Sequence, residues 1–104
     1  VVLKGHKTVV TDSKEIFTNP SGGPSLAKGG SGDILAGLIA GLWAQNGISK
    51  GFSLKTAFES ACLGVYLHGL CGDLAAKKFT ERCVLAGELL DFLPEAYRKI
   101  TPSL

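Results

Sequence analysis

The chain has 104 residues, 45% of them hydrophobic and 19% charged, which is enough apolar material for one globular domain and argues against disorder. The formal net charge is only +2, and the basic residues are scattered along the chain, so no nucleic-acid partner is expected. No apolar run approaches the roughly 20 residues of a membrane-spanning helix, and charged residues soon after Val1 argue against a signal peptide, so no membrane partner is expected. Three cysteines without a C-x-x-C pair are typical of a reducing, cytoplasmic location.

Short extended segments are predicted before residue 30. Residues 1–3 form an apolar run, and residues 8–11 and 15–18 are rich in β-branched side chains, so three short strands are expected. The turn-like residues 12–14 join the last two strands into a hairpin. Residues 19–28 contain two Pro, two Gly and two Ser, and they are predicted to form a loop.

Two long helices are predicted from residue 31 onward. Apolar residues at helical spacing predict a first helix that begins at Ser31 and ends at Gly47. Ser53 is a plausible N-cap for a second helix, which either continues past Gly69 and Gly72 or breaks there before it ends near residue 79.

A third helix is predicted over residues 83–93, and Pro94 fits the first turn of a short terminal helix. Strands therefore come first and helices second, which indicates an α/β fold class. Three short strands cannot cover helices this apolar, so the chain is interpreted as the C-terminal part of a larger sheet domain.

A glycine-rich loop enters the first helix at residues 29–33, which read Gly-Gly-Ser-Gly-Asp. The first turn of a helix has N–H groups without partners and a partial positive charge, so it attracts anions such as phosphate. Asp33 could then act as a general base on an attacking hydroxyl. A simple N-cap formed by Ser31 or Asp33 explains the same residues equally well. The spacing matches neither a Walker loop nor a G-x-G-x-x-G fingerprint.

Several motifs together carry a resemblance. They are Lys-Gly-His-Lys-Thr at residues 4–8, Asn-Pro at 19–20, Leu-Ala-Lys-Gly-Gly-Ser-Gly-Asp-Ile-Leu-Ala-Gly at 26–37, Gly-Val-Tyr-Leu-His-Gly at 64–69, Gly-Asp-Leu-Ala-Ala at 72–76 and Ala-Gly-Glu-Leu-Leu-Asp at 86–91. Through these motifs the chain resembles the ATP/ADP-dependent NAD(P)H-hydrate dehydratases of the ribokinase-like superfamily, over essentially all 104 residues and in the family's order.

The resemblance implies a ribokinase-like α/β fold, with residues 1–104 forming the C-terminal part of a single dehydratase domain. It implies that Asp33 contacts the hydrated NADH or NADPH substrate and acts as the base, that Asn19 also contacts substrate, and that ATP or ADP, with the Mg²⁺ it carries, is the driving nucleotide. No metal site formed by protein residues is expected. The implied nucleotide-binding residues are Lys4, Gly5, His6, Lys7, Thr8, Gly30, Ser31 and Gly32, the last three forming an anion hole.

The chain departs from the family pattern in its loop and its length. Gly23 and Ser25 stand where the family commonly has Asn and Gly, and the family's domain is considerably longer. Catalysis is therefore expected to need a missing N-terminal portion, and this portion or a second copy of the chain is the expected partner. A small-molecule kinase and a non-catalytic fragment that binds nucleotide or a partner chain remain the alternatives.

The remaining polar and aromatic candidates have simpler readings. His68 lies in an apolar helix and is interpreted as a core histidine with satisfied hydrogen bonds. Cys62 and Cys71 are interpreted as small core residues. Trp43 is expected to pack where the first helix meets its neighbours.

Overall fold

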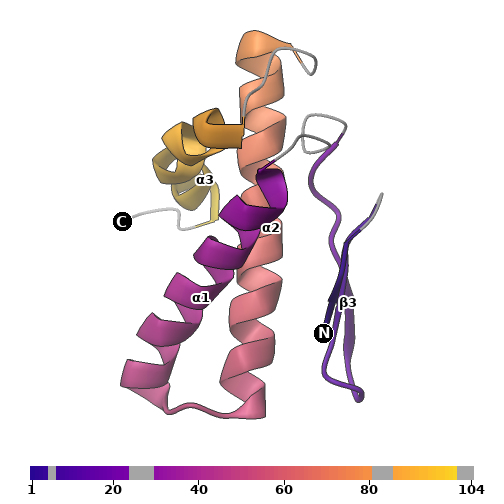
Figure 1. The fold of residues 1–104 in the computed structure, drawn as a ribbon, viewed down its shortest axis with the longest axis vertical. Helices are drawn as coiled ribbons and strands as arrows, with labels where there is room; N and C mark the ends of the chain where they lie inside the picture. The colour runs from indigo at the N-terminus through magenta and orange to yellow at the C-terminus, as the bar shows by residue number, and fades with distance from the viewer. Residues whose placement is uncertain (5–6, 24–29, 81–85, 101–104) are drawn as a thin grey trace.

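The computed structural model describes residues 1–4, 7–23, 30–80 and 86–100, with three short strands followed by helices (Figure 1). The elements are β1 (Val2–Leu3), β2 (Val9–Thr11), β3 (Ile16–Thr18), α1 (Ser31–Lys50), α2 (Leu54–Phe79), the 3-10 helix η2 (Ala86–Phe92) and α3 (Leu93–Ile100). The predicted order of strands first and helices second is confirmed.

The strands form an antiparallel sheet in the order β1-β2-β3. Val10 in the middle strand is opposite Val2 on one side and Phe17 on the other. The turn between β2 and β3 is held by Asp12, whose Oδ1 accepts hydrogen bonds from the backbone N–H groups of Glu15 at 2.7 Å and Lys14 at 2.9 Å. These bonds lower the pKa of the Asp12 carboxyl. The predicted hairpin is therefore confirmed.

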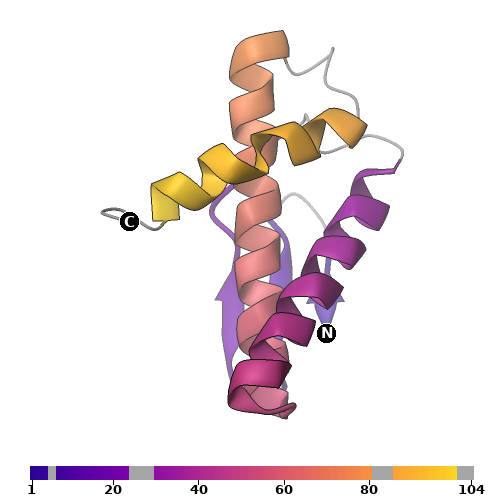
Figure 2. The same ribbon diagram turned by 90° about the vertical axis from the view of Figure 1, so that its left-hand side faces the viewer.

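Helix α2 is the axis of the fold. The sheet lies on one side of it, and α1 and α3 lie on the other (Figures 1 and 2). Its 26 residues rise about 39 Å at the usual 1.5 Å per residue, which equals the longest extent of the molecule, 39 Å. The helix begins with a capping box in which Ser53 Oγ accepts from Thr56 N and Thr56 Oγ1 accepts from Ser53 N.

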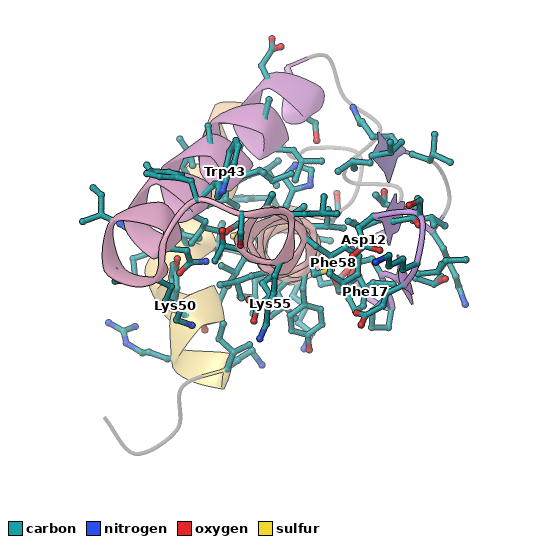
Figure 3. All side chains as sticks on the ribbon, turned by 90° about the horizontal axis from the view of Figure 1, so that it is seen from below. Asp12, Phe17, Trp43, Lys50, Lys55 and Phe58 are labelled. Atoms are coloured by element: carbon teal, nitrogen blue, oxygen red, sulfur yellow. The ribbon has the colours of Figure 1, made fainter. Side chains whose placement is uncertain are left out.

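Two apolar clusters form on α2, toward its two ends. The first lies under the sheet, where α1 and α2 meet β2, and its buried members are Val10, Leu35, Ala61 and Val65. The second joins α1, α2, η2 and α3, and its buried members are Leu42, Leu67, Cys71, Leu74, Ala75, Leu89 and Ala96. Figure 3 shows Phe58 of α2 lying toward Phe17 and Asp12 of the hairpin, whereas Trp43 lies away from the sheet on α1.

The predicted end of the first helix at Gly47 differs from the structure. Helix α1 passes through Gly47 and ends at Lys50. The glycine is needed for close packing, because any Cβ at Gly47 would collide with the Phe52 ring. This ring in turn meets Trp43 edge-on at 5.9 Å between centroids. Helix α2 continues past Gly69 and Gly72, which is one of the two alternatives left open by the sequence.

The predicted third helix is a 3-10 helix over its described part, and residues 81–85 lie outside the described residues. Pro94 is the second residue of α3, in its first turn as predicted, where its missing N–H leaves no helical hydrogen bond unmade.

Candidate active site

The first turn of α1 leaves its backbone N–H groups without an intrahelical partner. The N-cap is Gly30, with a left-handed backbone at φ 90°, and its carbonyl accepts the first helical hydrogen bond from Ile34 N at 3.1 Å. Gly30 has no side chain, and no side-chain cap hydrogen bond is formed at this position. The alternative that Ser31 or Asp33 forms the N-cap is therefore wrong. Within the described part of the chain, the N–H groups of residues 31–33 have no partner outside the helix, which is the arrangement that attracts an anion.

Lys4 brings a positive charge to this turn. It follows β1 directly, is exposed, and places its Nζ against Gly32, where any added Cβ would collide with it. An ammonium beside the positive end of a helix is a repulsive arrangement, which a bound anion would reverse. Lys4 and Gly32, two predicted nucleotide-binding residues far apart in the sequence, are thus side by side.

Ser31 is the buried residue of the turn, with only 2% of its surface exposed. Its Oγ and its carbonyl oxygen both lie 3.1 Å from Nε2 of His68 on α2. His68 is 6% exposed, and its pKa is lowered, first by burial and then by the positive charge of Lys4, against the opposing effect of its bond to the Ser31 backbone. His68 is therefore a buried, hydrogen-bonded histidine, as predicted, and it is neutral at pH 7.

Asp33 completes the turn with an exposed carboxylate. It is the acidic residue in the first turn of α1, where the helix end favours a negative charge. The same exposure lets the carboxylate reach a bound substrate. A phosphate group held by the N–H groups and Lys4 would lie next to this carboxylate, which is the arrangement that phosphoryl transfer to a hydroxyl requires.

Asn19 lies away from solvent, with 4% of its surface exposed. Its Nδ2 donates to the carbonyl of Val65 at 3.0 Å, and its Oδ1 accepts from the backbone N–H and the hydroxyl of Ser21 at 3.2 and 2.9 Å. Its backbone N–H donates to the carbonyl of Thr8 at 2.8 Å, which joins two predicted site residues. These contacts hold the loop after β3 in place, and the substrate contact of Asn19 stays a prediction.

Residues on one face of α2 contact Ser21 and Gly22, which follow β3. Gly69 lies so close to Ser21 that a Cβ there would collide with its hydroxyl, and Ser21 Oγ donates to the carbonyl of Tyr66 at 3.0 Å. One turn further, Asp73 Oδ2 accepts from Gly22 N at 3.1 Å. The roles of Ser21 and Asp73 were missed from the sequence, although residues 65, 69 and 73 recur at the four-residue spacing that marks one helix face.

The other predicted nucleotide residues are only partly placed. Gly5 and His6, and residues 24–29 of the loop, lie outside the described residues. Lys7 is exposed and Thr8 is half-buried just before β2. Over the described ranges, no three His, Cys, Asp or Glu side chains are grouped to hold a metal ion. Within the same ranges, no helix is long and apolar enough to cross a membrane.

Comparison with known proteins agrees with this geometry. A family model described as NAD(P)H-hydrate dehydratase matches residues 1–95. The chain is 44% identical over 101 residues to a bifunctional NAD(P)H-hydrate repair enzyme, Nnr, of Moorella thermoacetica, covering 96% of this chain and 18% of the relative. It is 41% identical over 106 residues to an ADP-dependent (S)-NAD(P)H-hydrate dehydratase of Neisseria meningitidis, covering 100% of this chain and 33% of the relative.

A solved structure is similar as well. The ADP/ATP-dependent NAD(P)H-hydrate dehydratase of Bacillus subtilis, co-crystallized with ATP and Mg²⁺, superimposes with a TM-score of 0.78 at 36% identity. The match covers 96% of this chain and 34% of that one. The chain thus spans about a third or less of the relatives it matches.

Proposed function

Because the chain belongs to the NAD(P)H-hydrate dehydratase family, we propose that it forms the part of a nucleotide-dependent lyase site that holds the phosphates and the catalytic base. The predicted α/β, ribokinase-like fold is confirmed, and the chain contains a segment of it. The proposed reaction removes water from hydrated NADH or NADPH at the expense of ATP or ADP. The assignment of residues 1–104 to the C-terminal part of one domain belongs to the same proposal.

The observation that carries the proposal is the uncapped first turn of α1. Its N–H groups and the Lys4 ammonium provide positive charge at Gly32, and the Asp33 carboxylate lies in the same turn. Oriented backbone donors in such a place stabilise negative charge that develops on a transferring phosphoryl group.

The proposed chemistry has two steps. Asp33 takes the proton of the substrate hydroxyl as the hydroxyl oxygen attacks the terminal phosphorus, so that a new O–P bond forms and the bond to the leaving nucleotide breaks. Phosphate then leaves with the electrons of the C–O bond while the neighbouring carbon loses a proton, which restores the C=C bond of the nicotinamide ring. The net result is loss of water from the hydrate and hydrolysis of one phosphoanhydride.

The nucleotide also accounts for the metal. In this proposal Mg²⁺ arrives with the nucleotide, since magnesium is commonly bound through substrate phosphates with few protein ligands. The proposed partners are the small-molecule substrate and the rest of the longer chain that the relatives have, or else a second copy of the chain. A cytoplasmic location, expected from the cysteines, is part of the same proposal.

The test uses the full native chain in which this sequence occurs, with hydrated NADH and either ATP or ADP. We expect absorbance at 340 nm to recover, and Asp33→Asn to slow that recovery by at least about 100-fold, as is typical for loss of a general base. Asp91→Asn is the control, because Asp91 is an exposed carboxylate on η2, outside the α1 first turn, and this variant should keep full activity.

Two outcomes would contradict the proposal. Accumulation of a stable phosphorylated product, with no recovery at 340 nm, would indicate the kinase alternative. Full activity of a folded Asp33→Asn variant would remove the residue from the mechanism.

A further inference from the structure

We infer that His68 is a positioning residue, which fixes the direction of the Gly32 N–H in the phosphate-binding turn by holding the Ser31 carbonyl. The inference rests on the proposed function for its link to catalysis. His68 does not touch the phosphate site itself. It acts through Ser31, which lies one residue before the glycine that Lys4 contacts.

The hydrogen bonds determine which ring nitrogen carries the proton. Nε2 of His68 is 3.1 Å from the Ser31 carbonyl oxygen, and a carbonyl oxygen only accepts. Nε2 must therefore be the N–H of the neutral ring, and it donates to the carbonyl and to Ser31 Oγ, which is also 3.1 Å away. Because the hydroxyl accepts in this arrangement, its own hydrogen remains available for another acceptor.

Peptide planarity carries the effect from Ser31 to Gly32. The Ser31 carbonyl and the Gly32 N–H belong to one planar, trans peptide unit, in which they point in opposite directions. The helix already points this N–H toward its N-terminal end, and the contact with His68 limits how far the shared peptide plane can rotate from that direction. A preorganised donor needs no reorientation when charge develops on a transferring group, which is where catalytic advantage arises.

The contact between His68 and Ser31 is buried, so water cannot readily replace either partner. Both residues are more than nine-tenths buried, and they come from different helices, 37 positions apart. Burial and the Lys4 charge lower the pKa of His68, so the ring donates without adding a charge. The Ser31 carbonyl belongs to the first turn of α1, so without the imidazole it is held only within its own helix and loses its buried tie to α2.

The test compares two substitutions in the full native chain. His68→Leu fills the space without a donor, whereas the amide of His68→Gln reaches about as far as Nε2 and can still donate to the Ser31 carbonyl. We expect His68→Leu to lower kcat about tenfold and to weaken ADP binding, measured by calorimetry, by a similar factor. His68→Gln should recover most of both.

A matched variant separates positioning from stability. Ser60→Ala removes a fully buried hydroxyl of the same helix, α2. This hydroxyl donates to the carbonyl of Thr56 in α2 and accepts from Asn46 in α1, and neither partner lies in the first turn of α1. It should lower the unfolding midpoint and leave kcat and ADP affinity unchanged. The inference is overturned if Ser60→Ala reduces kcat as much as His68→Leu, or if His68→Gln is no better than His68→Leu.

Nitrogen NMR of the imidazole gives a readout that does not depend on turnover. We expect the resonances of a neutral ring protonated at Nε2, and a ring protonated at Nδ1 would overturn the inference. If the wild-type chain does not act on the hydrate but His68→Leu still weakens ADP binding and His68→Gln restores it, the proposed function fails while this inference stands.

Discussion

The smallest feature with a functional consequence is the hydrogen atom that serves as the side chain of Gly32. A methyl group in its place would collide with Lys4 Nζ. Because the atom it meets is the tip of a flexible side chain, the helix can accept the methyl group only if the ammonium moves. Residue 32 therefore sets the distance between the lysine charge and the helix end.

Gly32→Ala should weaken nucleotide binding while the fold is kept. We expect ADP affinity in the full native chain to fall about tenfold, the size of one charge-assisted contact, with little change in the unfolding midpoint. Gly37→Ala is the control, because a Cβ there meets nothing within 4 Å in the described part of the chain. Equal ADP affinity in wild type and Gly32→Ala would show that the Lys4 position does not matter for binding.

The depressed pKa of His68 makes stability depend on pH. Below about pH 6.5, the ordinary pKa of the ring, the unfolded chain takes up a proton that the folded chain resists, since burial and Lys4 disfavour the charged ring. The free energy of unfolding should therefore fall as the pH is lowered from 7.5 to 5.5. Urea unfolding of His68→Gln over the same range should lack this component, and an identical pH dependence in both proteins would contradict the assignment.

At the scale of elements, small residues decide how closely α1 and α2 approach. A Cβ on Gly64 of α2 would lie 2.6 Å from Cγ1 and 3.4 Å from Cα of Ile39 on α1. The severe contact is with the Ile39 side chain, which would have to leave its position, whereas the Cα already lies at about van der Waals distance. Gly69 allows a similar close approach on the sheet side of α2, where Ser21 packs against it.

Gly64→Ala should destabilise the fold, because the Ile39 side chain must move from its packed position against α2. The cost of overpacking is about 1 to 3 kcal/mol, and the better helix propensity of alanine returns at most about 1 kcal/mol of it. Urea unfolding measures the difference. Gly41→Ala, at an exposed position of α1 where a Cβ meets nothing within 4 Å in the described part, should be neutral or stabilising. A stabilised Gly64→Ala variant would mean that the helices do not pack as described.

Across the whole molecule, the sequence predicts the secondary-structure elements better than it predicts how those elements contact one another. The strands, the hairpin and the Ser53 cap follow from local chemistry, and each is confirmed. Gly47 misleads and Gly69 leaves the prediction undecided, because a glycine that allows close approach of another segment has the same sequence signature as one that ends a helix.

The candidate site likewise combines features that adjacent residues reveal with contacts between residues far apart in the sequence. The motif with Asp33 can be found from sequence because its residues are adjacent, but an N-cap formed by Ser31 or Asp33 could be excluded only once Gly30 was placed. The contacts of His68 with Ser31 and of Asp73 with Gly22 join distant positions, and no local pattern predicts which partner each side chain finds.

The core cluster shared by α1, α2, η2 and α3 offers a probe of global unfolding. Cys71 is 3% exposed, and burial raises the pKa of its thiol to about 11. At pH 8 only about one thiol in a thousand is the reactive thiolate. In a Cys62→Ser, Cys83→Ser background, labelling of Cys71 should be slow and should accelerate with urea in parallel with global unfolding. Fast labelling that urea does not change would contradict this burial.

The uncapped start of α1 has a thermodynamic consequence. The helix begins at a glycine N-cap, and a side-chain cap would stabilise it by only about a few tenths of a kcal/mol more. The free chain therefore carries a small deficit at the position where its ligand would bind. An incoming phosphate would fill the role of the absent cap, so that occupancy and the order of the first turn rise together. Backbone amide exchange at residues 31–33 would then act as a built-in gauge of ligand binding.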